Sequence, residues 1–219
     1  MRATIVLVVV VAVILVSVFA FSSPKSQVPA AASISTTDVT KSAAGNGADL
    51  PFVQGGTIAM ELEGADYKVT PSGNDHITIS YGTNPFNTQL TKIAAGVKGS
   101  EANVRIQTPS GNGIHVEIGI PAKTNLYTRM TAGNLTVEGI EGSKDLELRA
   151  GNMTIDVVDA KQYGPVYASV SSGDLAADAW SVNKGGILRS FKTNGSGKYG
   201  LHAHVSAGKL TLTERSGMK

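Results

Sequence analysis

The sequence contains no cysteine among its 219 residues. Disulfide bonds, thiolate metal sites, cysteine nucleophiles and a lipid anchor on an N-terminal cysteine are therefore excluded. Aromatic residues make up 5% of the chain and charged residues 16%, whereas there are 25 glycines. Many glycines with few aromatic residues suit tight turns between short strands better than a helical protein. Stability must therefore come from the packing of a β-rich core.

Strong charge of either sign is also missing. The chain has 19 basic and 17 acidic residues, a net charge of +2. A main partner made of nucleic acid or anionic lipid would call for a clear basic excess. The composition therefore predicts that the chain does not bind nucleic acid.

The N-terminus is apolar. No charge occurs from Ala3 to Ser23, and only Arg2 precedes this run. Residues 1–21 are predicted to form an apolar helix that acts as a signal peptide or a signal anchor. About 18 apolar residues span about 27 Å as a helix, close to the minimum for a bilayer, so length does not decide between the two. Because the positive charges precede the run, the rest of the chain is predicted to leave the cytoplasm.

The composition then divides the remainder in two. Residues 22–50 are rich in Ser, Ala, Thr and Pro and are predicted to be a flexible tether. Residues 51–219 are predicted to be one β-repeat domain. In its first half, apolar and polar residues alternate over Ile58–Leu62, Ile77–Ile79, Val104–Ile106 and Ile114–Ile120, which predicts strands. Gln89–Val97 has a weak helical spacing, although the glycines after it favour a loop or a strand.

A short phrase recurs four times in the second half. It consists of a small residue, a glycine, a polar residue and then alternating apolar and polar residues, and it occupies Ala132–Val137, Ala150–Ile155, Ser172–Ala177 and Ala207–Leu212. Each copy predicts a turn that leads into a short strand. The glycines of the first three copies are 18 and 22 residues apart, and Gly195 would add another 22. This period predicts a small β-solenoid or β-roll with coils of about 18–22 residues. An antiparallel β-sandwich is the alternative, because strands 8–12 residues apart are also typical of it.

The phrase also predicts the role of its residues. Its glycines are expected at coil corners, with positive φ, and its polar residues are expected to stack in a short ladder of turn residues. These structural repeat turns are Gly133, Asn134, Gly151, Asn152, Gly173, Asp174 and Gly208.

The chain resembles a known family in four stretches, Ile118–Pro121, Leu126, Ala132–Val137 and Ser171–Leu175. This family is the bacterial "putative adhesin" β-strand-repeat family, a domain of unknown function, and the resemblance extends over about residues 52–215. The resemblance implies a β-solenoid-like domain, exported or membrane-anchored at the cell envelope. It implies no catalytic residue, since none is defined for the family. The chain departs from the repeat at Lys209 and at Ala176-Ala177.

Few residues suggest chemistry. His202 and His204 lie two apart on a predicted strand and could face one metal ion, but no third ligand is adjacent, so two polar residues on a solvent face are favoured. No metal or other cofactor is predicted. Paired carboxylates in a groove could cleave glycans, yet each candidate acid also suits a turn, so no catalytic residue is predicted. Trp180 and Tyr199 could form a sugar platform, although core positions are favoured. The candidate acids are Asp156, Asp159, Asp174 and Asp178.

The sequence therefore predicts an exported, non-enzymatic protein of the cell envelope. It would be periplasmic, membrane-anchored and facing outside, or on the cell surface, and it would serve adhesion, interaction or scaffolding. Its partner would be an envelope protein or a surface glycan, with the membrane contacted through residues 1–21 if they are not cleaved. The first alternative is an accessory or regulatory component of an envelope-stress or membrane complex. The second is a carbohydrate-active enzyme on a β-solenoid.

Overall fold

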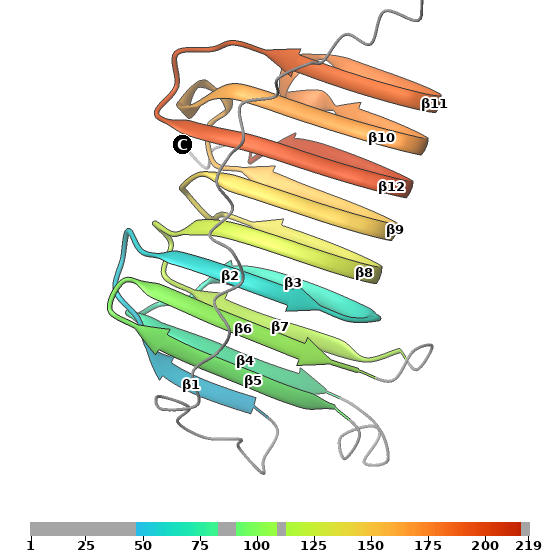
Figure 1. Ribbon diagram of the computed structural model, residues 1–219. Coiled ribbons are helices and arrows are strands. Elements are labelled where there is room, and N and C mark those ends of the chain that lie inside the picture. Colours follow the sequence, from blue (N-terminus) through green and yellow to red (C-terminus); the bar gives the residue numbers. More distant parts are fainter. Residues whose placement is uncertain (1–46, 83–90, 109–112, 216–219) are drawn as a thin grey trace, which may run out of the picture. The chain divides into compact units, whose positions relative to one another are not determined.

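The computed structural model describes residues 47–82, 91–108 and 113–215 (Figure 1). All of them lie in the second of two compact units, residues 36–219. They form the strands β1 (Gly47–Pro51), β2 (Thr57–Leu62), β3 (Ala65–Pro71), β4 (His76–Gly82), β5 (Lys92–Lys98), β6 (Glu101–Gln107), β7 (His115–Ile120), β8 (Asn125–Glu138), β9 (Lys144–Val157), β10 (Tyr163–Ala177), β11 (Val182–Thr193) and β12 (Tyr199–Glu214). Two short 3₁₀ turns, η1 (Ala160–Gln162) and η2 (Asp178–Trp180), complete the described elements.

The all-β class predicted from the sequence is confirmed, since the described residues contain no α-helix. None of these residues belongs to a helix of the length and apolarity that crossing a membrane requires. The helix predicted over residues 1–21 lies outside the described residues, as does most of the predicted tether. Strand β1 begins at Gly47, inside the range 22–50 that composition assigns to the tether.

The strands form two layers because each long strand bends in its middle. The first half of β8 pairs in parallel with β2, whereas its second half pairs in parallel with β3. Strands β9, β12 and β10 continue this pairing in parallel on both sides of the bend. We call the layer that contains β5, β6, β2 and the first halves of the long strands the first layer. The second layer contains β1, β4, β7, β3 and the second halves.

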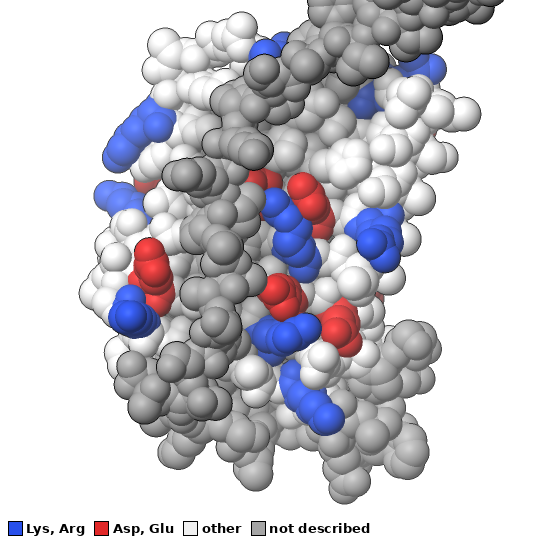
Figure 2. All heavy atoms as spheres, viewed as in Figure 1, with Lys and Arg blue, Asp and Glu red and all other residues white. Residues whose placement is uncertain are grey.

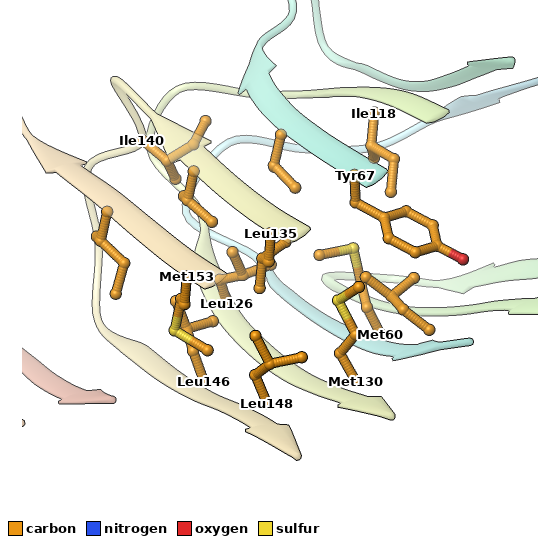
Figure 3. Packing of buried hydrophobic residues seen from close by; sticks show 14 of the residues in the cluster. Met60, Tyr67, Ile118, Leu126, Met130, Leu135, Ile140, Leu146, Leu148 and Met153 are labelled. Atoms are coloured by element: carbon orange, nitrogen blue, oxygen red, sulfur yellow. The ribbon is translucent and has the colours of Figure 1, made fainter. Parts of the chain in front are cut away.

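The core lies between the two layers and follows from the alternation in the sequence. On β8, Leu126, Thr128 and Met130 point inward from the first layer, and Leu135 and Val137 point inward from the second. The same parity holds on β9, so that the inward-facing residues of neighbouring strands stack on one another. Figure 3 shows the resulting contact between methionine, leucine and isoleucine side chains of both layers. Because the chain has no disulfide bonds, the burial of these apolar side chains is what stabilises the fold.

The bends occur at the glycines of the recurring phrase. Gly133, Gly151, Gly208 and Gly173 have φ of +110°, +130°, +139° and +130°, and they are in register on four neighbouring strands. A Cβ atom on Gly151 would overlap the carbonyl oxygen of Gly133, so neighbouring backbones touch at the corner. Glycine is required there for its positive φ and for this close approach.

The described strands do not show a solenoid, because the order in which the coils stack and the role of Gly195 both differ from the expectation. A solenoid that coils in chain order would place β10 beside β9, but β12 lies between them and pairs with both. Gly195 is not a fourth corner, because it lies in the connection between β11 and β12. The antiparallel sandwich also fails, since β8, β9, β12 and β10 are parallel neighbours. Residues 92–97 of the segment with weak helical spacing lie in β5, a strand antiparallel to β6, in agreement with the preference for a loop or a strand there.

Candidate functional site

The outer surface of the first layer carries a row of charged side chains. We call it the charged row; its residues come from five neighbouring strands and are in direct register. They are Arg105, Glu61, Arg129, Glu147 and His204. The strands have solvent on this side, so alternate positions can be polar. Figure 2 views this face and shows basic and acidic side chains gathered over its middle.

Two ion pairs join residues of the charged row. Arg105 Nε lies 3.3 Å from Glu61 Oε2, and Arg129 Nε lies 3.0 Å from Glu147 Oε2. Arg129 Nη1 also lies 3.3 Å from Asp145 Oδ1, in the adjacent row. Exposed pairs of this kind add little stability, so their value here is that they fix the orientation of planar side chains.

The adjacent row supplies aromatic surface. Tyr127, Asp145, His202 and Tyr167 lie in register on β8, β9, β12 and β10. The ring of Tyr167, which is 41% exposed, stacks on the His202 imidazole at a centroid distance of 5.3 Å. Burial alone would raise the pKa of Asp145, but hydrogen bonds with His202 and Arg129 outweigh it and lower that pKa. Asp145 therefore stays ionised and holds both partners.

Beside the corner of the strands, the first layer has a hollow of about 470 Å³. A volume of this size is within the range of small-ligand sites. Charged residues of β2, β6, β8 and β9, and Glu63 just after β2, line it together with Thr131, His204 and Ser206. The charged residues are Glu61, Glu63, Arg105, Arg129, Glu147 and Arg149.

Two of the six Arg and Glu side chains that line the hollow form no ion pair with another described residue. Arg149 is exposed, and the described residues provide no ion-pair partner for it. Glu63 likewise has no ion pair within the described ranges, although its carboxylate accepts a hydrogen bond from Gln107 Nε2 at 3.2 Å. Both groups remain available to a ligand.

The two histidines singled out in the sequence lie on the outer face of β12 and do not converge on a metal site. His202 Nδ1 is 2.9 Å from Asp145 Oδ1, and His204 Nδ1 is 2.8 Å from the Ser169 hydroxyl. Across the part of the chain that the structure describes, no group of three or more His, Asp or Glu side chains could hold a metal ion. His204 does line the hollow, a role that its sequence position alone did not indicate.

The candidate acids serve separate local structures. Asp156 Oδ2 lies 3.2 Å from Arg215 Nε, and Asp159 caps η1 by accepting a hydrogen bond from the Lys161 amide. Asp178 begins η2. None of these acids lines the hollow.

The predicted ladder of turn residues forms in part. Asn152 Nδ2 donates to Asn134 Oδ1 at 3.0 Å, and Asn134 Nδ2 donates to Asp66 Oδ1 at 2.7 Å. Lys209 stands between Asn152 and Asp174 because β12 is inserted between β9 and β10. Asp174 is therefore separated from the other two by one strand.

The two aromatic residues considered for a sugar platform lie elsewhere. Trp180 packs on Phe191 at a centroid distance of 5.8 Å, and Tyr199 packs on Tyr163 at the same distance. The aromatic residues of the adjacent row are Tyr127 and Tyr167, which do not line the hollow themselves. The repeat register could have identified them, since Tyr127 precedes Gly133 by the same six residues that separate Tyr167 from Gly173.

A buried lysine was missed by sequence reasoning. Lys144 is 2% exposed and points inward beside Leu126 and Leu201. Its Nζ donates to the carbonyl oxygens of Ile140 at 2.7 Å and Gly142 at 3.1 Å, and it also hydrogen-bonds the Tyr163 hydroxyl. Burial lowers the pKa of Lys144 to about 7. The lysine ties down the turn between β8 and β9.

Comparisons with known proteins identify no family. No protein-family model and no curated protein matches the chain. One similar solved structure is described as a "putative cell adhesion protein from Clostridium sporogenes ATCC 15579". It shares 13% identity, the match covers 77% of this chain and 99% of that chain, and the TM-score is 0.47. A likeness at this level carries no argument about function, and the resemblance to the adhesin family stays a prediction.

Proposed function

We propose that the chain is an exported interaction module of the cell envelope that binds its partner through the hollow on the first layer. The observation that carries this proposal is the hollow itself, where side chains from four strands form a fixed array of donors and acceptors. A surface that only needed to be soluble would gain little from such ordered pairs, because exposed ion pairs contribute at most about 1 kcal/mol each.

We also propose that binding at the hollow is not followed by catalysis. A glycoside hydrolase needs one carboxyl group that stays protonated until it donates its proton. Glu61 and Glu147 each have an arginine side chain within 3.3 Å, which occupies carboxylate oxygens that a proton transfer would use. Ion-paired carboxylates suit recognition better than proton transfer.

The test is co-sedimentation of the full chain with bacterial cell envelopes in a polyoxyethylene detergent, which keeps the apolar N-terminus from inserting into membrane. The double variant Arg129→Gln/Glu147→Gln removes an outward ion pair of 3.0 Å from the first layer without changing net charge. The control Lys68→Gln/Glu138→Gln removes a 3.1 Å pair from the outer face of the second layer. We expect the first variant to lose at least tenfold in affinity and the control to bind like the wild type. Equal binding by all three proteins would refute the role of the hollow.

Export is tested separately, and it rests on the uncharged Ala3–Ser23 run. A reporter fused after Lys219 that works only outside the cytoplasm is expected to be active. A fusion whose activity is confined to the cytoplasm would contradict the proposal.

A further inference from the structure

We infer that the hollow binds an uncharged glycan chain, an inference that rests on the proposed function and names its ligand. Three arginines and three glutamates line the hollow, so their formal charges cancel. A polyanion would bring its charges against Glu61, Glu63 and Glu147, and a polycation would meet the arginines. Either approach would desolvate like charges side by side, which is costly.

An uncharged polyhydroxyl ligand has no such conflict. A hydroxyl group donates to a carboxylate and accepts from a guanidinium, so both kinds of lining residue can bond it. The ion pairs of the charged row hold Arg105, Glu61, Arg129 and Glu147 in position before the ligand arrives. Pre-positioned side chains lose less conformational entropy on binding. Arg149 and Glu63, which lack ion pairs among the described residues, would bond the ligand directly.

The neighbouring row adds the apolar contact that sugar rings need. One face of a sugar ring carries mainly C–H groups, and aromatic rings pack well against such a surface. Tyr167 offers an exposed ring that His202 stacking holds in place, and Tyr127 lies in the same row three strands away. Adjacent strands are about 4.8 Å apart, close to the length of one sugar unit in an extended chain. A glycan lying across the strands would therefore meet one side chain of the row per unit.

The experiment is affinity electrophoresis of the full chain in native gels that contain a soluble polysaccharide. The uncharged probes are dextran, mannan, galactomannan and hydroxyethyl cellulose, and hyaluronate is the anionic probe. A polyoxyethylene detergent keeps the apolar N-terminus in solution, because a sugar-headed detergent would compete for the site. We expect at least one uncharged probe to retard the wild type and hyaluronate to have no effect.

Two variants place the binding on the hollow and on the adjacent row with its exposed tyrosine. Glu63→Gln/Arg149→Gln keeps the net charge and should raise the dissociation constant at least tenfold, as should Tyr167→Ala. Lys68→Gln/Glu138→Gln, on the other layer, should bind like the wild type. Retardation by no uncharged probe, by hyaluronate alone, or equally for all variants would overturn the inference. If the chain still sediments with envelopes through Arg129 and Glu147, only the ligand class is refuted; if it does not, the proposed function fails as well.

Discussion

Replacing Gly208 with alanine should destabilise the protein severely. Gly208 has φ of +139°, and an alanine Cβ would lie 2.7 Å from the carbonyl carbon of Gly151 and closer still to its oxygen. Strained backbone of this kind costs about 1–3 kcal/mol for a residue with a side chain. Overpacking against a neighbour costs about 1–3 kcal/mol more.

The two costs add because neither can relax. Gly208 lies between Gly151 and Gly173, whose backbones already touch it on both sides, so a shift on one side tightens the other. We expect Gly208→Ala to lower the free energy of unfolding by about 3 kcal/mol or more. For a domain of this size the melting temperature should fall by roughly 6–12 °C.

The matched control is Gly200→Ala in the same strand. A Cβ on Gly200 would meet no atom within 4 Å, and its φ is not positive. Its melting temperature should therefore stay within about 2 °C of the wild type, since surface changes rarely exceed about 0.5 kcal/mol. Thermal unfolding followed by circular dichroism measures both variants. Equal, small changes for the two variants would refute the account of the corner.

Three further predictions concern the core and the histidines. Folding lowers the pKa of Lys144 from 10.5 to about 7, so between pH 7 and 10 the unfolded chain binds more protons than the folded protein. The free energy of unfolding should therefore rise by about 2 kcal/mol from pH 7 to 9. Denaturant titration should show this rise for the wild type and not for Lys144→Met. The Thr128 hydroxyl is buried with no hydrogen-bond partner among the described residues. Thr128→Val should therefore raise the free energy of unfolding by roughly 1 kcal/mol in the same titration, and a lower value would show that the hydroxyl has a partner. His202 and His204 are held by Asp145 and Ser169, so neither chelator nor added Zn²⁺ should move the melting temperature; a metal at 100 times its dissociation constant would add about 2.7 kcal/mol and be easily detected.

Local structure followed from the sequence because each strand has its own alternation. Ile58–Leu62 and Ile114–Ile120 fall on β2 and β7 within one residue. The recurring phrase also identified the corners, since only glycine accepts both the φ and the close backbone contact there.

The order of the strands did not follow from the sequence, and the reason is physical. The phrase around Gly208 matches those around Gly151 and Gly173 equally well, so any two copies can stack. What differs is the route of the chain between them: β11 turns back antiparallel to β10, and β12 then enters beside β9. No local pattern encodes that route.

Part of the candidate site could have been predicted from the sequence. Arg129 and Glu147 are separated by the same 18 residues as Asn134 and Asn152, so the repeat period could have paired them across β8 and β9. Glu61 and Arg105 lie outside the recurring phrase, on strands whose register only the folded chain reveals. Lys144 shares the inward parity of Leu146 and Leu148, a signal of burial that was present in the sequence.

The most direct test of the central claim is hydroxyl-radical footprinting of the full chain with and without bound cell envelopes. The account predicts that Tyr167, Tyr127 and His204, on the outer face of the first layer, become protected when envelopes bind. His115, which is exposed on the second layer, should react at an unchanged rate. Protection of His115 with no change at Tyr167 and His204 would contradict the claim that the hollow is the binding surface.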